Sequence, residues 1–277
     1  MKRLMMLAAL FGTTAAAPVT DGEAVSLSLY QGKQFTVGAI VAGKPRTFLF
    51  DTGEGLTMIS PALAQALGCD PWGNITAFRM LGERLDTKRC DGVSFGIGRD
   101  RYVAPSVIVY DLGEIAGKQA TPVDGAVGLD LFAGRTITID LARRQISLET
   151  SASLKRRLRG AVEVPLRLVT SDAGGLDVNL GVTTPRGLAW MELDTGNAGP
   201  TIFVSPAMAP LFGLNPATRD PQDVTVHLGT AELKTRARVF PGMIMDGNIG
   251  MQLVRDRTIT LDLKAGRAWL APDKATH

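Results

Sequence analysis

The stretch FLFDTG at residues 48–53 decides the fold, because it occurs a second time, as MELDTG, at residues 191–196. In each copy an aspartate, Asp51 or Asp194, follows an apolar run typical of a β-strand and precedes Thr-Gly. A carboxylate at the end of an apolar strand is costly to bury alone. If a fold with twofold pseudosymmetry brought the two carboxylates face to face, they would share one proton, since neighbouring like charges do not both ionise easily.

The sequence around the two copies is duplicated as well. Three further blocks recur in the same order: residues 60–71 with 205–216, residues 124–131 with 246–253, and residues 135–141 with 257–263. The last two pairs keep the same offset of 122 residues. Matched blocks in one order indicate an internal duplication, so the chain is predicted to form two similar lobes.

We predict an N-terminal lobe at residues 18–148, a linker at 149–161 and a C-terminal lobe at 162–277. The linker contains the basic run KRRLR at residues 155–159. Such a run is either an anion-binding patch or a solvated linker or short linker helix, and the second interpretation is favoured.

The composition indicates a mainly all-β chain. Of the 277 residues 45% are hydrophobic and 31 are glycine, and apolar residues alternate along many short runs. Each lobe is predicted to contain one short helix. In the first, Ser60 is a suitable N-cap, Pro61 fits the first turn and Gly68 fits the end. The second helix, after Ser205, is predicted to be weakened by Pro210.

Residues 1–17 have the pattern of a secretory signal peptide: a basic start at Lys2 and Arg3, a short apolar core and a small-residue cleavage zone. The alternative is a buried N-terminal strand or helix. The apolar core is too short to span a membrane. We therefore expect a bacterial periplasmic or secreted protein with no membrane anchor. The only two cysteines, Cys69 and Cys90, are expected to form a disulfide in such a compartment; two buried thiols are the alternative.

The charge balance gives no reason to expect a nucleic acid partner. The formal net charge is +3, and removing Lys2 and Arg3 leaves +1 (3 − 2). Two histidines, together with two cysteines that are expected to pair, do not make a metal site. We therefore expect neither a metal nor a cofactor.

These duplicated motifs resemble those of the pepsin/retropepsin-like aspartic peptidases. In that family an apolar pair and Asp-Thr-Gly are followed by a helix-containing stretch and then by an apolar-apolar-Gly element. Residues 126–128 and 248–250 match the last element, although Asn248 is polar where the family prefers an apolar residue. The resemblance implies two β-barrel-like lobes of the acid-protease fold in a single chain, working as a monomer.

The resemblance also implies roles for the residues of the two loops. Asp51 and Asp194 would be the catalytic dyad. Thr52 and Thr195 would cross-link the loops through their hydroxyls, and Gly53 and Gly196 would let the loop backbones pack closely. Hairpins at residues 76–90 and 224–239 lie in sequence where a flap over the dyad would come from. The alternative for each is a plain surface hairpin.

The chain departs from the family directly after each Asp-Thr-Gly. Glu54 would raise the pKa of the dyad if it points inward, although it can instead point to solvent. Asn197 could donate a hydrogen bond to the dyad, which would favour ionisation.

Two functions follow from this sequence. The first is an aspartic endopeptidase, in which Asp51 and Asp194 activate a water against an extended peptide or protein substrate. The alternative, motivated by Glu54 and Asn197, is a catalytically weak or inactive periplasmic peptide-binding module on the same fold. A third possibility, strand-end turns in an unrelated β-sandwich, leaves the ordered duplication unexplained.

Overall fold

The computed structural model describes residues 22–117 and 119–272. The predicted signal peptide at residues 1–17 therefore lies outside the described part of the chain. Within that part, no helix is long and apolar enough to cross a membrane.

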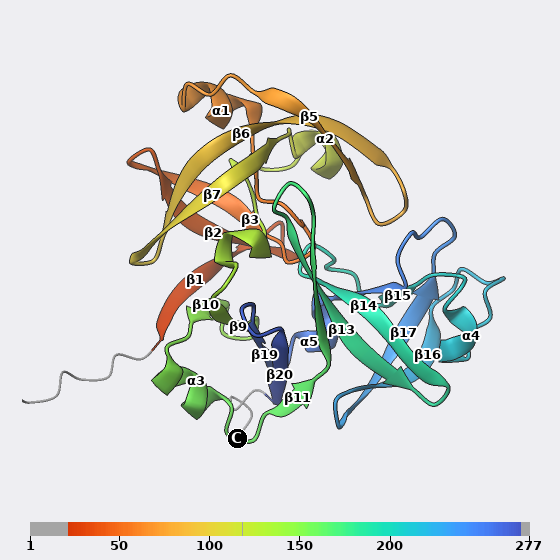
Figure 1. Cartoon of the computed structure of the whole chain (residues 1–277). Helices are drawn as coiled ribbons and strands as arrows, with labels where there is room; N and C mark the ends of the chain where they lie inside the picture. Colours follow the sequence, from red (N-terminus) through yellow and green to blue (C-terminus); the bar gives the residue numbers. More distant parts are fainter. Residues whose placement is uncertain (1–21, 118, 273–277) are drawn as a thin grey trace, which may run out of the picture.

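Each lobe contains a closed six-stranded β-barrel, so the predicted all-β acid-protease-like fold is confirmed (Figure 1). The N-terminal barrel is closed by the pairing of β2 with β6. Its strands, in spatial order, are β2 (Gln34–Val41), β3 (Lys44–Phe50), β8 (Gly125–Val127), β4 (Met58–Ile59), β7 (Asp100–Val109) and β6 (Arg84–Ile97). Alternate apolar side chains, such as Val37, Ala39 and Val41, fill the barrel because successive strand residues point to opposite faces.

The C-terminal barrel repeats this arrangement and is closed by β13 and β16. Its strands, in the corresponding order, are β13 (Leu176–Thr184), β14 (Gly187–Asp194), β18 (Gly247–Gly250), β15 (Ile202–Val204), β17 (Ala231–Val239) and β16 (Gln222–Leu228). The same strand order in both barrels is the spatial form of the duplication in the sequence.

A sheet shared by both lobes joins the barrels. Its strands, in order, are β11 (Val162–Val164), β20 (Arg267–Pro272), β19 (Arg257–Asp262), β9 (Thr136–Asp140), β10 (Gln145–Leu148) and β1 (Glu23–Tyr30). The twin strands β9 and β19 pair at its centre, where the twin residues Thr138 and Thr260 face each other. Their buried hydroxyls are 2.9 Å apart and hydrogen-bonded, which places the pseudo-twofold axis at this pair.

The helices are short, and two of them lie where the sequence predicts. α1 (Pro61–Ala66) begins after Ser60, whose hydroxyl accepts a hydrogen bond from the backbone N–H of Leu63 at 3.1 Å. Its twin α4 (Ala209–Phe212) is shorter and has Pro210 in its first turn. α3 (Ser151–Arg157) lies in the predicted linker and is capped by Thr150.

Three further helical turns were not predicted from the sequence. They are α2 (Gly113–Ala116), the 3₁₀ turn η1 (Leu129–Phe132) and α5 (Met251–Val254). Each is a single turn, which is too short to show a helical period in the sequence. η1 and α5 are twins that follow the apolar-apolar-Gly elements and bury apolar side chains in their barrels.

The two hairpins proposed as flaps have different positions. The first, made by β5 (Trp72–Phe78) and the start of β6, borders the cleft between the lobes through residues 77–81, 83, 85 and 87. The second, made by β16 and β17, turns at Gly229 against the backbone of Glu163 in β11. It therefore packs against the shared sheet, and only the first hairpin can act as a flap.

Cys69 and Cys90 form a disulfide that ties the end of α1 to β6. The bond closes a loop with a sequence separation of 21 residues, and closing a loop of this length restricts the unfolded chain enough to stabilise the fold by about 3 kcal/mol. We expect a thiol reductant to lower the unfolding midpoint of the wild type in denaturant titrations. The double variant C69A/C90A should unfold at a lower midpoint that no longer responds to reductant; an equally reductant-sensitive double variant would contradict this assignment.

Candidate active site

Two equivalent strand ends deliver the two aspartates to the boundary between the lobes. β3 ends at Phe50, and β8 runs parallel to it, so that the N–H of Asp51 donates to the carbonyl of Val127 at 3.0 Å. β14 ends at Asp194, which pairs with Gly250 of the parallel strand β18. In each lobe, the apolar-apolar-Gly element therefore supports the Asp-Thr-Gly loop from the adjacent strand.

The loops are cross-linked by reciprocal hydrogen bonds of two threonines that are completely or almost completely buried. The Thr52 hydroxyl donates to the Leu193 carbonyl at 2.6 Å and accepts from the Thr195 N–H at 3.0 Å. The Thr195 hydroxyl donates to the Phe50 carbonyl at 2.9 Å and accepts from the Thr52 N–H at 3.0 Å. Each hydroxyl uses both its donor and its acceptor capacity across the lobe boundary, which fixes the two loops relative to each other.

This cross-link brings Asp51 and Asp194 together, and their carboxyl groups hydrogen-bond to each other. Asp51 Oδ1 also accepts the N–H groups of Gly53 and Gly196, each at 3.0 Å. Burial, followed by the negative charge of Asp194, raises the pKa of Asp51 well above its usual range. A side chain at Gly196 would place its Cβ 2.2 Å from Asp51 Oδ2, so the close approach requires glycine.

Asn248, which lies in β18, contacts the dyad. Its Nδ2 donates to Asp194 Oδ2 at 2.7 Å and to Oε2 of the buried Glu192 at 3.1 Å. Burial, then the charge of Asp194, raises the pKa of Glu192 to about 9. The motif around Asp194 does not predict a role for Glu192. Comparing the two copies position by position would have found it, because the N-terminal lobe has Leu49 there.

The structure corrects the expected contact of Asn197 with the dyad. Its backbone N–H donates to Asp194 Oδ1 at 3.0 Å. Its side-chain Nδ2, however, donates to Asn248 Oδ1 at 2.8 Å, while its Oδ1 accepts from the N–H of Gly199. The side chain therefore reaches the dyad only through Asn248, because its two polar atoms are already held on either side.

Glu54 is half-buried and borders the cleft beside the dyad. Burial, followed by the charges of Asp51 and Asp130, raises its pKa well above the usual range. Asp130 accepts the hydroxyl and the N–H of Thr57, at 2.7 and 3.0 Å, and burial raises its pKa as well. Among the residues that the structure describes, no group of three or more His, Cys, Asp or Glu side chains is arranged to hold a metal ion.

Asp177 brings a carboxylate from the C-terminal lobe to this acidic group. It follows Leu176, the first residue of β13, whose N–H donates to the Gly55 carbonyl of the other lobe at 2.7 Å. Burial, then the charge of Asp130, raises the pKa of Asp177 to about 6. The folded state therefore favours the protonated form of Asp177 more than the unfolded chain does.

We expect the variant D177N to be more stable than the wild type at neutral pH. Because the folded pKa of about 6 lies above the usual 3.8, the contribution of Asp177 to stability is complete below pH 4 and is lost as the pH rises through 6. At pH 7.5 the gain is up to about 3 kcal/mol, since one pKa unit corresponds to about 1.4 kcal/mol. Thermal unfolding at pH 4 and 7.5 tests this; an equal gain at both pH values would be inconsistent with titration of Asp177.

The cleft over the dyad has a volume of about 530 Å³. Its apolar lining includes side chains from the flap, the N-terminal barrel and the C-terminal lobe: Leu49, Met58, Phe78, Met80, Leu81, Ile108, Phe203 and Met245. The tip of the flap contacts the C-terminal lobe directly, where the N–H of Ile244 donates to the carbonyl of Met80 at 3.1 Å. This hydrogen bond links the flap to the C-terminal lobe beside Met80 and Met245, which both line the cleft.

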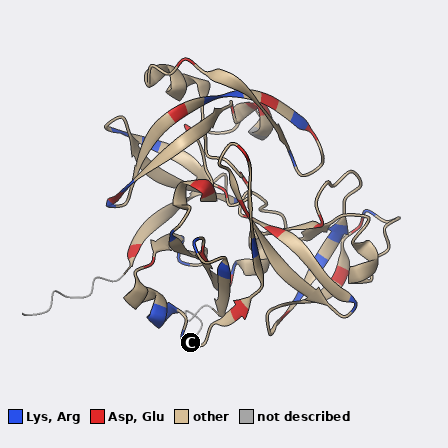
Figure 2. Ribbon diagram, in the orientation of Figure 1, with Lys and Arg blue, Asp and Glu red and all other residues tan. Residues whose placement is uncertain are grey.

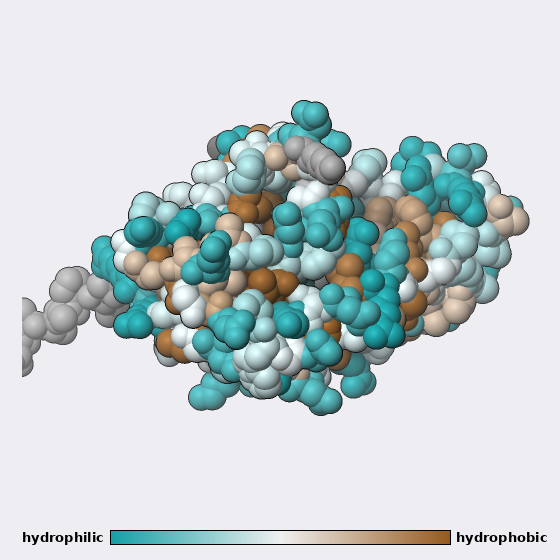
Figure 3. Space-filling view, turned by 90° about the horizontal axis from the view of Figure 1, so that it is seen from above, coloured by the Kyte–Doolittle hydropathy of each residue, from teal (hydrophilic) through white to brown (hydrophobic). Residues whose placement is uncertain are grey.

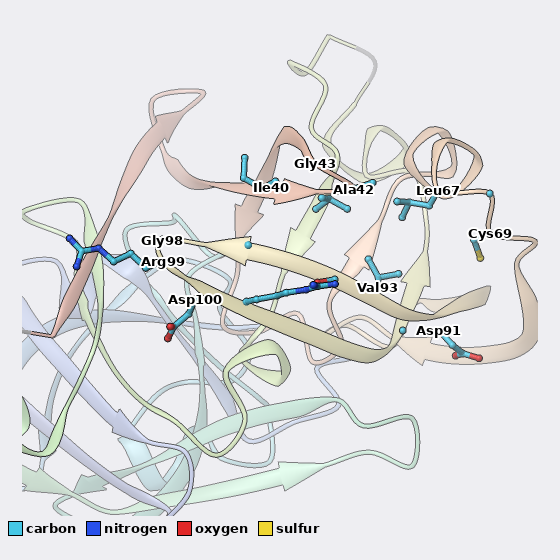
Figure 4. Close-up of a pocket in the computed structure, with 16 residues that line it drawn as sticks. Ile40, Ala42, Gly43, Leu67, Cys69, Asp91, Val93, Gly98, Arg99 and Asp100 are labelled. Carbon is cyan, nitrogen blue, oxygen red and sulfur yellow. The ribbon is translucent and has the colours of Figure 1, made fainter.

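A second depression lies on the outer face of the N-terminal barrel, between α1, the end of β2 and the β6–β7 turn (Figure 4). It has a volume of about 770 Å³ and is lined by Ile40, Leu67, Val93 and Arg99, among others. None of the dyad loop residues borders it. The dyad therefore lies in the smaller of the two depressions, the cleft between the lobes.

Comparisons with known proteins agree with this architecture. Residues 19–131 match a family model described as aspartyl protease. A basic 7S globulin from soybean is similar in structure, with a TM-score of 0.58 and 9% identity over 91% of this chain and 95% of that one. Conglutin gamma, a basic 7S globulin from lupine seeds, has a TM-score of 0.54 and 10% identity over 90% and 94%. No curated protein sequence matches the chain.

The predicted resemblance to the pepsin/retropepsin-like aspartic peptidases is therefore confirmed. The N-terminal lobe matches the aspartyl protease family model, and both lobes together have the fold of these enzymes. These two structures carry the name of a globulin and are about 10% identical to the chain, so the likeness to them establishes the fold alone.

Proposed function

We propose that the protein is an aspartic endopeptidase that hydrolyses peptide bonds in the cleft between its lobes. The observation that carries this proposal is the dyad itself: Asp51 and Asp194 hydrogen-bond to each other in loops that Thr52 and Thr195 lock together. Two structural aspartates would not need to approach each other, since burying two neighbouring carboxyl groups is unfavourable.

The chemistry follows from one proton shared by two carboxyl groups. The ionised carboxylate takes a proton from a water molecule, whose oxygen attacks the peptide carbonyl carbon. The protonated carboxyl gives its proton to the carbonyl oxygen, and this forms a tetrahedral diol. Proton transfer to the amide nitrogen then breaks the C–N bond. No covalent bond to the protein forms in this sequence.

The cleft fits an extended, largely apolar stretch of polypeptide. The flap strands β5 and β6 have backbone groups that can pair with a peptide in the manner of an added strand. The apolar side chains of the lining, such as Phe78 and Met245, favour apolar side chains next to the cleaved bond. Such a stretch is accessible in an unfolded protein or a peptide.

The setting we propose is the periplasm or the medium, where the Cys69–Cys90 disulfide persists. Positive and negative residues alternate over both lobes, which gives no field that would attract a nucleic acid (Figure 2). On the face seen from above, apolar residues lie in small patches among hydrophilic ones, which suits a monomer (Figure 3).

Incubation with a reduced, unfolded protein between pH 3 and 8 tests the proposal. Mass spectrometry of the products should show new internal termini flanked by apolar residues. The double variant D51N/D194N, purified in parallel, should yield none. Products of identical sequence and amount from both proteins would reveal a contaminating peptidase and would contradict the proposal.

A peptide-binding module without turnover is the second candidate. It is favoured by the flap tip, which is already bonded to Ile244 across the cleft, and by the additional carboxyl group of Glu54 beside the dyad. The same incubation distinguishes the two candidates, because a binding module would retain extended peptides uncut throughout this pH range.

A further inference from the structure

We propose that Asn248 is a positioning residue that makes the two carboxyl groups of the dyad unequal, so that Asp194 is the ionised base and Asp51 carries the shared proton. This inference rests on the proposed function and names the role of each aspartate within it. It is carried by a chain of hydrogen bonds present in the C-terminal lobe and impossible in the N-terminal lobe.

The chain begins at the backbone of Gly199 and ends at Asp194. The N–H of Gly199 donates to Asn197 Oδ1 at 3.0 Å, and Asn197 Nδ2 donates to Asn248 Oδ1 at 2.8 Å. Asn248 Nδ2 then donates to Asp194 Oδ2 at 2.7 Å. Because a backbone N–H can only donate, it fixes the orientation of both amides. The end of the chain therefore always presents an N–H donor to Asp194.

The oxygens of the two aspartates are occupied differently. Asp194 accepts a hydrogen bond on each oxygen: the N–H of Asn197 on Oδ1, and Asn248 Nδ2 on Oδ2. Asp51 accepts both of its backbone N–H groups on Oδ1. Hydrogen bonds to both oxygens favour the charged form. Asp51 Oδ2 remains the oxygen best suited to hold the proton.

The N-terminal lobe cannot provide the same contact. At the positions of Glu192, Asn197 and Asn248 it has Leu49, Glu54 and Ala126. Leucine and alanine offer no donor, and the half-buried Glu54 offers only a carboxyl group. The sequence differences between the two copies therefore give the two aspartates different hydrogen-bond partners.

The titratable groups around Asp194 are all acidic. They are Asp51 at the end of β3, Glu54 in the following loop and Glu192 in β14; Asp177 in β13 and Asp130 in η1 interact in turn with Glu54. All are acidic, so each disfavours a second negative charge when it ionises. Glu192, the other acceptor of Asn248 Nδ2, has a pKa of about 9 and is neutral at acidic pH, where it does not compete with Asp194.

The proposed step balances with one water. Asp194 takes one proton from the water, whose oxygen forms the new bond to the peptide carbonyl carbon. Asp51 passes its proton from Oδ2 to the carbonyl oxygen. The step leaves Asp194 protonated, Asp51 ionised and the substrate as a neutral diol. When the C–N bond breaks, Asp194 returns its proton to the leaving nitrogen, and Asp51 recovers one from the diol.

Titration of the carboxyl groups tests the inference without turnover. In protein labelled with carboxyl-¹³C aspartate, the two resonances are assigned with D51N and D194N, and we expect the proton that the dyad shares to lie on Asp51. In N248A the acidic limb of kcat/KM against pH should move up by about one pH unit, as expected for the loss of one hydrogen bond to a charged acceptor. In the ¹³C spectra of N248A the shared proton should be divided more equally between the two carboxyl groups.

Two further variants complete the test. E192Q keeps an acceptor for Asn248 and should leave the acidic limb in place, because Glu192 is neutral there. The double variant E192L/N248A gives the C-terminal lobe the pair that Leu49 and Ala126 form in the other lobe. It leaves no acceptor without a partner at position 192. It should therefore show the same shift even if N248A folds poorly.

A shared proton that lies on Asp194 in the wild type, or an unchanged acidic limb in both Asn248 variants, would overturn the inference. A wild type that titrates as expected but never cleaves a peptide would uphold the inference and refute the proposed function.

Discussion

Replacing Asp51 or Asp194 with asparagine is expected to reduce the kcat for peptide cleavage by about 10³-fold or more. General acid–base catalysis alone contributes 10² to 10⁴, and here one proton passes through both groups. Asparagine at either position can neither accept the proton of water nor deliver one to the carbonyl. Initial rates on a peptide with a single cleaved bond, measured for the three proteins at several pH values, give the comparison.

The fold of both variants should survive, because asparagine has nearly the same shape as aspartate and carries no charge. Burial already raises the pKa of Asp51, so a neutral side chain is accommodated there. D172N, which alters an exposed aspartate outside the cleft lining, is the matched control and should keep wild-type rates. Undiminished cleavage by both dyad variants would refute the assignment.

Replacing Thr52 with valine should lower both the stability and the activity. The hydroxyl is fully buried, and its loss leaves the Leu193 carbonyl and the Thr195 N–H without their partner. Each buried polar group left unpaired costs about 1–3 kcal/mol, so we expect a loss of about 2–4 kcal/mol in the free energy of unfolding. Loosening the loops should also lower kcat by about 10- to 100-fold, since small displacements of reacting groups are costly.

T52S is the matched control, because serine keeps the hydroxyl and loses only a methyl group. It should retain most of the stability in denaturant titrations and most of the activity. If T52V and T52S lost the same stability, the methyl group and not the hydrogen bonds would hold the loops, and the cross-link would have no energetic role.

The features that the sequence predicts well are those that recur in it. The duplicated blocks predict two barrels with equal strand order, and the repeated Asp-Thr-Gly predicts which aspartates belong together. Ser60 and Pro61 predict the start of α1 because capping is a local interaction. Pro210 likewise predicts a shorter second helix.

The features that the sequence does not predict depend on contacts between distant segments. The two hairpins look alike in sequence, and only packing against Glu163 shows that the second is no flap. Asp177 is an ordinary strand residue until the lobes bring it near Asp130. The amide of Asn197 fits a direct contact with the dyad equally well, and the hydrogen bond from Gly199 decides otherwise.

A crystal structure with a bound peptide analogue, in which a hydroxyl-bearing carbon replaces the cleaved amide, tests the central claim most directly. Because this group imitates the tetrahedral diol, we expect its hydroxyl to lie between Asp51 and Asp194, about 2.6–3.0 Å from an oxygen of each. The peptide should extend beneath the flap, and the Ile244–Met80 contact should be broken. A peptide bound elsewhere, with only solvent between the two carboxyl groups, would contradict the claim.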